Sequence, residues 1–232
     1  MNKQSAEIFD QNYLNRQYDT GSADMARTVL ELGGLAMKFA HVERAPHHSD
    51  GRRENDAEHS FNLGLVAPEL AVALYPYLDA GLIAQFSMVH DLIELEVGDV
   101  ATFNISERAL GVKETQEHTQ LDRLLSKLPP YLRSLVERYE AQEETEAVFT
   151  RCVDKLLPAA QDINGDGVRV MLEDYGIRSL ADLQRCQGEV RERIVKRFGR
   201  FPELILIKDV LDQQFELKWL TESSVQIPEY QD

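Results

Sequence analysis

The stretch VHDLIELEVGDVATFN, residues 89–104, places a histidine and an aspartate side by side in an otherwise apolar run. Its periodicity predicts a helix over residues 79–97 in which His90 faces the interior, and Asp91 follows about 100° further round the helix axis. A folded protein does not bury a charge unless something compensates for it. A divalent cation is the candidate compensator, so the stretch predicts a metal site whose other ligands lie elsewhere in the chain.

The whole chain has the pattern of a soluble, all-α protein. Its 232 residues suffice for one domain with a large core, and a hydrophobic fraction of 43% with 28% charged residues is ordinary for a globular protein. Apolar residues recur at spacings of three and four, and convincing alternation with a period of two is absent. We therefore expect a single-domain, all-α fold.

Five helices are predicted before Gly167, and amphipathic segments continue beyond it. The five cover residues 23–42, 56–75, 79–97, a segment from Ser106 to just before Pro129, and 143–163, the last kinked at Pro158. A polar loop rich in histidine, arginine and aspartate separates the first two. We expect residues 1–22 to form an N-terminal extension, residues 23–175 the core, and residues 176–232 C-terminal helices that pack on it.

Charge and cysteine content limit the partners and the compartment. Forty acidic against 25 basic residues give a net charge of −15, which argues against a long nucleic acid as partner but allows a small anionic substrate. Cys152 and Cys186 form no CxxC pair, which leaves a zinc ribbon or a disulfide framework without support. The N-terminal residues include no apolar signal, and no run is long enough to span a membrane. The sequence predicts a cytoplasmic protein without a membrane partner.

Two further side chains complete a candidate ligand set. His59 falls on the helical face of Leu63, Val66 and Leu70. Asp154 lies in the apolar segment AVFTRCVDKLL, where an acid needs a partner. A lone histidine of this kind is more often a hydrogen-bonded core residue, and a lone buried aspartate is more often not a ligand. Together with His90 and Asp91, however, both are predicted to bind the same cation.

Two more acids border the predicted cation. Glu94 lies one helical turn after His90 on the same face, and Asp99 follows where the helix ends at Gly98. A cation lowers the pKa of bound water, and neighbouring carboxylates can orient that water and move protons. The arrangement indicates hydrolysis. For Glu96, in contrast, a solvated acidic face is the preferred interpretation.

The ordered motifs RAP, RRENDAEHS, HDLIELEVGD and EAQEETEAVFTRCVDKL, spread over about Arg44 to Gln161, resemble the HD-domain metal-dependent phosphohydrolase superfamily. The resemblance is closest to the branch of bacterial 5'-deoxynucleotidases and their human HD-domain relatives. It implies an HD-domain helical bundle that binds manganese, cobalt, magnesium or a similar divalent cation. The implied metal ligands are His59, His90, Asp91 and Asp154, and the implied catalytic acids are Glu94 and Asp99.

The same resemblance implies a nucleotide substrate. Arg44 matches the arginine that grips the phosphate, and His47, Arg52 and Arg53 could reach further phosphates. The expected reaction is release of phosphate from a (deoxy)nucleoside 5'-monophosphate. A deoxynucleoside triphosphate triphosphohydrolase and a non-catalytic nucleotide-sensing module are the alternatives. Ala45 replaces the aromatic residue that follows the arginine in the deoxynucleotidases. The family commonly forms dimers, so a homodimer is expected as well.

A second metal motif competes with this hypothesis. The segment DINGDGVRVMLE, residues 162–173, has acids or amides at the positions of a calcium loop and a glycine at its turn. Arg169, however, stands where such a loop inserts an aliphatic residue, and no partner loop is evident. A polar turn between two helices explains the same residues and is preferred.

Overall fold

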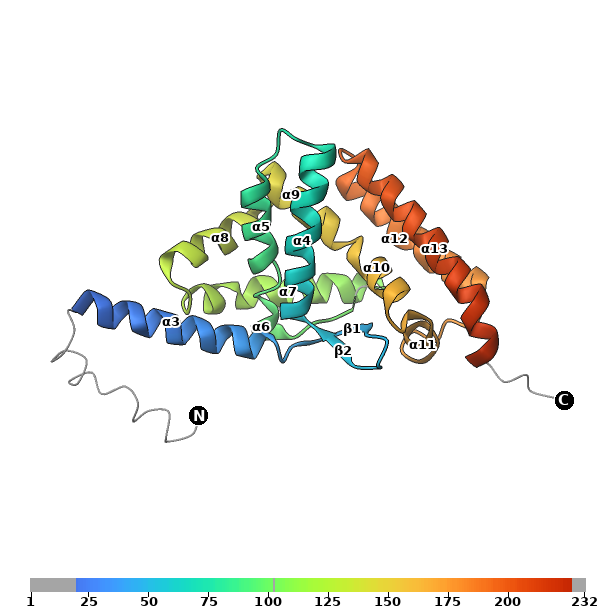
Figure 1. The fold of residues 1–232 in the computed structure, drawn as a ribbon, viewed down its shortest axis with the longest axis horizontal. Helices are drawn as coiled ribbons and strands as arrows, with labels where there is room; N and C mark the ends of the chain where they lie inside the picture. Colours follow the sequence, from blue (N-terminus) through green and yellow to red (C-terminus); the bar gives the residue numbers. More distant parts are fainter. Residues whose placement is uncertain (1–19, 102, 227–232) are drawn as a thin grey trace. The chain divides into compact units, whose positions relative to one another are not determined.

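The computed structural model describes residues 20–101 and 103–226, which form helices and one two-stranded antiparallel sheet (Figure 1). The all-α prediction is confirmed. Two compact units are present, Met1–Phe39 and Ala40–Asp232. The described part of the first is a single helix, α3 (Thr20–Phe39). No described helix is both long and apolar enough to cross a membrane. The boundaries expected at residues 22 and 175 stay predictions.

Three helices form the centre of the second unit. α4 (Asp56–Leu74) packs along α5 (Ala80–Val89), and α9 (Thr145–Asp154) packs against both. Their shared core is almost fully buried and contributes about 1.5–3 kcal/mol for each large apolar side chain. The residues at its centre are Leu63, Ala67, Ala71, Ile83, Phe149, Cys152 and Val153. This core fixes the ends of the three helices relative to one another.

The helix predicted over residues 79–97 is interrupted just where the histidine and aspartate lie. α5 ends at Val89, residues 90–93 form a turn, and the short helix α6 (Glu94–Val97) follows. Within the turn, amides bond to carbonyls three residues back rather than four, as from Leu92 to Val89 at 3.2 Å. The continuous helix was therefore a wrong prediction. The tighter winding changes the directions in which successive side chains leave the backbone.

The helix predicted over residues 143–163 is also two helices, not one kinked helix. α9 ends at Asp154, and α10 (Leu157–Asn164) begins with Pro158 in its first turn. A proline has no amide hydrogen to donate to the preceding turn, but a first-turn amide lacks a partner within its helix anyway. The break places the Asp154 side chain at the end of a helix.

A hairpin replaces the predicted polar loop. β1 (Glu43–His47) pairs in antiparallel fashion with β2 (Arg53–Asn55), and Gly51 takes a positive φ of 84° in the turn between them. Strands this short are hard to recognise by alternation, which is why the pattern did not reveal them. Arg44 and Glu54 are the buried residues of the pair. The hairpin thus carries two charged side chains into the interior.

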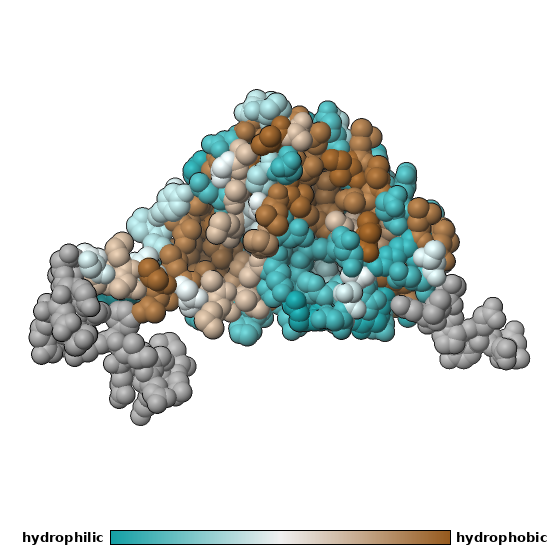
Figure 2. Space-filling model, viewed as in Figure 1, coloured by the Kyte–Doolittle hydropathy of each residue, from teal (hydrophilic) through white to brown (hydrophobic). Residues whose placement is uncertain are grey.

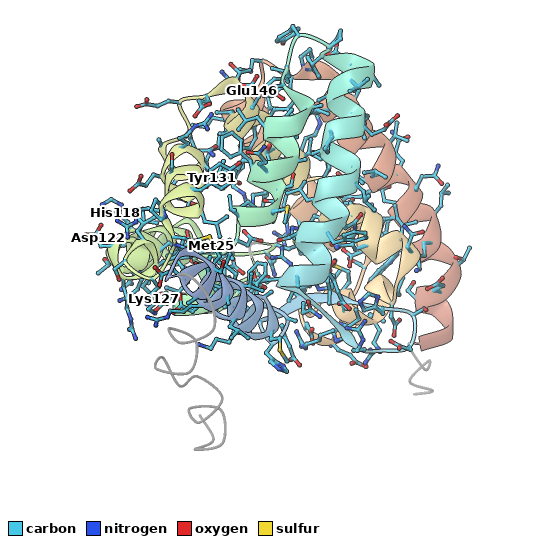
Figure 3. The ribbon with its side chains drawn as sticks, turned by 60° about the vertical axis from the view of Figure 1, so that its left-hand side comes forward. Met25, His118, Asp122, Lys127, Tyr131 and Glu146 are labelled. Atoms are coloured by element: carbon cyan, nitrogen blue, oxygen red, sulfur yellow. The ribbon has the colours of Figure 1, made fainter. Side chains whose placement is uncertain are left out.

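α7 (Glu107–Leu125) and α8 (Pro130–Ala141) lie on the side of the unit shown in Figure 3, where His118 and Asp122 mark α7 and Tyr131 marks the start of α8. The Tyr131 hydroxyl donates to Gln85 Oε1 of α5 at 2.7 Å. Glu96 forms ion pairs with Arg123 and Lys127. Glu96 therefore ties α6 to the end of α7 and has no part in the predicted site.

The C-terminal segments pack on the helices that end near Asp154. α13 (Pro202–Gln226) contacts α10, α11 (Gly167–Glu173) and α12 (Leu180–Phe198), and α12 contacts α9. They share a second core built around Val168, Met171, Leu183, Phe215 and Trp219. On the face seen in Figure 2, apolar side chains gather over the upper parts of α4 and α13, and hydrophilic ones lie over the hairpin.

Asn55 connects the hairpin to α4 and is expected to contribute to stability. Its side chain accepts from the amides of Ala57 and Glu58, and the Glu58 carboxylate accepts from the Asn55 amide. Asn55→Ala should lower the free energy of unfolding by about 1 kcal/mol in urea titrations. Asn55→Asp, which retains a capping oxygen, should lose much less. Equal stability of wild type and Asn55→Ala would contradict the capping role.

Candidate metal centre

The structure brings four of the predicted side chains into one buried cluster. His59 lies near the start of α4, His90 and Asp91 lie in the turn after α5, and Asp154 is the last residue of α9. One ligand atom from each lies within 4.8 Å of the others. His59 is 0% exposed, and His90 and Asp154 are also buried. The cluster depends on three element ends that the core holds together.

The distances between these atoms suit a single cation. His59 Nε2 lies 2.9 Å from Asp154 Oδ1, and His90 Nε2 lies 2.9 Å from Asp91 Oδ2. The two cross distances, from His59 to Asp91 and from His90 to Asp154, are 3.9 and 3.8 Å. Ligand bonds of about 2.0–2.2 Å allow two ligand atoms of one ion to lie up to about 4.4 Å apart. All four distances fall within that limit.

His90 provides an independent test of the fit. Its Nδ1 lies 2.9 Å from the carbonyl oxygen of Ser87, which can only accept, so Nδ1 carries the proton. Nε2 faces the cluster, and this buried nitrogen, although 2.9 Å from Asp91 Oδ2, makes no hydrogen bond of suitable geometry within the described chain. An unsatisfied buried acceptor is costly, and a cation would satisfy it. The donor set therefore fits a divalent metal.

His59 is supported from behind by a second set of polar groups. Its Nδ1 lies 3.6 Å from Glu54 Oε2 and 3.5 Å from Gln161 Nε2. Burial and the nearby Arg44 lower the pKa of His59, but hydrogen bonds to Asp154 and Glu54 outweigh them and raise it to about 9. A metal binds the neutral imidazole, so binding at His59 would displace a proton. A carboxylate behind a metal-binding histidine raises the basicity of the ring.

A second group of carboxylates surrounds Arg44. Oxygens of Asp56, Asp91 and Glu94 lie within 4.8 Å of one another. Arg44 Nη1 lies 3.0 Å from Asp56 Oδ1, 2.7 Å from Asp91 Oδ2 and 3.8 Å from Glu94 Oε2. Arg44 is 9% exposed, and although burial lowers its pKa, the charges of Asp91, Asp99, Asp154 and Glu94 raise it above its usual value. Arg44 therefore already supplies the positive charge that this second group requires.

Glu94, a member of this second group, is a neutral acid. Burial, with Asp91 nearby, raises the pKa of Glu94 to about 10, although the Lys113 ammonium acts in the opposite direction. Lys113 Nζ donates to Glu94 Oε1 at 3.1 Å, whereas Glu94 Oε2 has no hydrogen-bond partner among the described residues. Near neutral pH, Glu94 therefore retains a proton that it can donate.

Three charged residues of the site were not predicted from the sequence. Asp56 and Glu54 stand three and five residues before His59, at a helix start where acids are common, and Lys113 lies in the charged helix α7. The signal available for Asp56 and Glu54 was their position next to a predicted buried histidine. For Lys113 the sequence offered no signal, because its partner Glu94 lies 19 residues away.

A cavity of about 300 Å³ opens onto the cluster. Among its lining residues are Arg44, His90, Asp91, Glu94, Asp99 and Asp154. Asp99 thus reaches the same space as Glu94, as the sequence predicted. The rest of the lining comes from α7 to α13, and it includes Lys113, Arg151, Arg193 and Lys208. A small molecule in this space would contact the cluster directly.

The other residues predicted to contact substrate lie elsewhere. Arg52 forms a two-pronged pair with Glu58 at 2.8 and 2.9 Å, and Arg53 pairs with Asp174 at 3.1 Å. Neither lines the cavity at the cluster. His47 lines a separate hollow of about 590 Å³ bounded by α4, α10 and α13. Their role in substrate binding stays a prediction that this geometry does not favour.

The calcium-loop segment is a turn between α10 and α11. Arg169 holds Asp166 at 2.6 Å, and Asn164 donates to the Ala160 carbonyl. Burial raises the pKa of Asp162 to about 7, the opposite of what a charged calcium ligand requires. None of these residues belongs to a ligand cluster in the part of the chain that the structure describes. The preferred interpretation as a polar turn agrees with this arrangement.

Comparisons with known proteins identify the family of this chain and a solved structure of similar fold. A family model described as HD domain matches residues 36–185.

The chain belongs to the HD-domain family.

Among solved structures, a predicted metal-dependent phosphohydrolase from Magnetospirillum magnetotacticum MS-1 shares the fold, with a TM-score of 0.59 and 23% identity over 82% of this chain and 95% of that one. No curated protein matches the chain. Metal-dependent HD phosphohydrolases use divalent cations, and this HD domain has a His/Asp cluster able to bind one.

Metal content should depend on Asp154. Asp154→Asn keeps the size of the side chain but removes its charge, so it should weaken binding of manganese by more than tenfold, since changes to partners outside the ligand set already cost about 10–100-fold. Elemental analysis after equilibrium dialysis measures this. Asp166→Asn, in the turn after α10, should bind manganese as wild type does. Equal metal content of Asp154→Asn and wild type would remove Asp154 from the ligand set.

Arg44 is expected to be essential for stability as well as for any substrate contact. Arg44→Ala leaves Asp56 and Asp91 without their common cation, and breaking a buried pair in this way costs about 3–5 kcal/mol. Urea unfolding in the presence of a chelator should show that loss. Arg52→Ala, which breaks an exposed pair, is the matched control and should stay close to wild type. Similar stability of both variants would contradict the compensating role of Arg44.

Proposed function

We propose that this HD-domain protein is a metal-dependent phosphohydrolase that releases phosphate from a nucleoside 5'-monophosphate. The observation that carries the proposal is the position of a neutral buried acid, Glu94, beside the two-histidine, two-aspartate cluster in one cavity. Hydrolysis of a phosphate ester needs both a cation for the phosphoryl oxygens and a proton for the leaving oxygen. The name of the Magnetospirillum protein with the same fold supports the reaction class.

His59, His90, Asp91 and Asp154 would hold the cation. When bound, the cation supplies a water of lowered pKa and draws charge from the phosphoryl oxygens. Arg44 lines the same cavity, and its planar guanidinium suits a phosphoryl group. Its contacts to Asp56 and Asp91 hold the guanidinium in one orientation. This preorganisation lowers the cost of binding the substrate.

Glu94 is the better candidate for the proton donor. Its raised pKa keeps the carboxylic acid protonated, and Lys113 orients it through one oxygen, so the other oxygen remains available. Proton transfer to the 5' oxygen would make that oxygen a better leaving group. Asp99, which lines the same cavity, would orient the attacking water. The two acids thereby take different parts in the reaction.

A monophosphate is favoured over a triphosphate by the placement of the hairpin arginines. The basic loop with its histidines and arginines kept triphosphate cleavage open, and both of its arginines, Arg52 and Arg53, are paired with carboxylates outside the cavity. A non-catalytic sensor is less favoured, because Glu94 and Asp99 both line the cavity beside the cluster. The nucleotide itself rests on the resemblance of the motifs to the deoxynucleotidase branch.

The purified protein with manganese can be assayed against nucleoside mono- and triphosphates, with release of phosphate and of triphosphate measured separately. Phosphate from monophosphates is the expected product. Triphosphate release would support the alternative hydrolase. No product from any nucleotide, with bound metal verified by elemental analysis, would overturn the proposed function and favour the sensor.

Loss of the Glu94 proton should slow turnover without loss of metal. Glu94→Gln cannot transfer a proton, so kcat should fall by about 10²–10⁴. Glu117→Gln is the control, since Glu117 also lines the cavity and pairs with Lys113 at 3.4 Å. It should change kcat by less than a few fold. If Glu94→Gln retained the wild-type kcat, Glu94 would have no role in proton transfer.

A further inference from the structure

The cavity at the metal cluster has a wall that the family model does not include. The model ends at residue 185, whereas Gln187 and Arg193 of α12 and Lys208, Asp212 and Phe215 of α13 also line the cavity. The HD-domain match therefore covers the cluster but only part of the space next to it. These five residues lie on the two C-terminal helices, beyond the residues that the family model matches.

Gln187 is an unusual member of that wall. Gln187 is 6% exposed. Its side-chain Nε2 donates a hydrogen bond to the backbone carbonyl of Asp212 at 3.4 Å. Its Oε1 is buried and has no hydrogen-bond partner within the described residues. An unpaired buried acceptor destabilises the protein, so such a group calls for a donor. A ligand in the cavity can supply one.

The orientation of this amide is fixed. If the oxygen and nitrogen of Gln187 were exchanged, Oε1 would face the carbonyl oxygen of Asp212, and two acceptors would repel each other. The contact between α12 and α13 therefore uses the donor of this amide and leaves the acceptor unpaired. Lys208 donates to both carboxylate oxygens of Asp212, so the charges of these two side chains are paired with each other.

The surroundings of Gln187 suit a flat, mostly apolar ring. Leu183 and Phe215 line the cavity on α12 and α13, and Met171 lines it on α11. Phe103 and Tyr175 add an aromatic pair with ring centroids 5.1 Å apart. Apolar walls with one fixed polar group are typical of sites that bind a heterocycle and select among its edges.

We propose that Gln187 selects the nucleobase, accepting a hydrogen bond from an exocyclic amino group through Oε1. This inference rests on the proposed function and extends it to the class of base. Adenine and cytosine present an amino group where hypoxanthine and uracil present a carbonyl oxygen. Hypoxanthine or uracil would therefore place its carbonyl oxygen opposite Gln187 Oε1, and the two acceptors would repel each other. The C-terminal helices would thus determine the base, while the cluster acts on the phosphate.

The test compares kcat/KM for adenosine with inosine 5'-monophosphate, and for cytidine with uridine 5'-monophosphate, in the manganese-loaded protein. The amino-bearing member of each pair should be preferred by about 5- to 150-fold, the range for one buried group left unpaired. Gln187→Leu should bring both ratios close to one. Ribose 5-phosphate, which lacks a base, should be hydrolysed equally by both proteins. Gln184→Leu, an exposed glutamine of α12 that pairs with Glu216, should preserve the ratios.

The outcomes separate this inference from the proposed function. Equal rates within both pairs in the wild type, or an unchanged preference in Gln187→Leu, would overturn the role of Gln187 while leaving nucleotide hydrolysis intact. If no nucleotide is hydrolysed, the proposed function fails, and calorimetric binding of adenosine against inosine still tests Gln187. Tighter binding of adenosine, lost in Gln187→Leu, is the expected result, and equal binding of the two would overturn the inference.

Discussion

The structure of the site depends on how buried negative charge is compensated. Glu54, Asp91 and Asp154 approach the two histidines, Asp56 and Glu94 approach Arg44 beside them, and an uncompensated charge at this depth would destabilise the fold. Arg44 neutralises one group of carboxylates, and protonation removes the charge of Glu94. The four-ligand cluster remains, and its geometry suits a cation. Each charge therefore has its own form of compensation, and the proposed function assigns metal binding and proton transfer to residues according to this division.

The same requirement accounts for the position of every ligand at the end of an element. His59 stands in the first turns of α4, His90 and Asp91 in the turn after α5, and Asp154 at the last residue of α9. A long helix directs neighbouring side chains to different sides, about 100° apart. The interrupted helix after Val89 allows His90 and Asp91 to reach one point. The breaks are therefore part of the site, and the core of α4, α5 and α9 holds them in register.

The four candidate ligands could be predicted from the sequence because each is a polar side chain in an apolar segment, and the all-α class followed from periodicity. The helix breaks could not, since the pattern of apolar residues continues through Val89 and Lys155 without interruption. Arg44 was predicted through resemblance alone. Lys113 and Gln187 were missed, because their significance comes from contacts with Glu94 and Asp212, 19 and 25 residues away. Sequence patterns record burial along one element and not pairing between elements.

The division of the cavity between two parts of the chain has a consequence for specificity. The charged cluster, with Arg44 and Glu94, interacts with features that every phosphate ester has, so it cannot by itself distinguish one alcohol from another. Selection must come from groups that contact the rest of the substrate. Gln187 Oε1 would be such a group, because the free energy of binding depends on whether the substrate places a donor or an acceptor opposite this buried oxygen. α12 and α13 line the cavity but supply none of the four residues of the metal cluster, so their cavity-facing side chains can contact the rest of the substrate. A conserved reaction and a variable substrate are therefore compatible within one HD-domain fold.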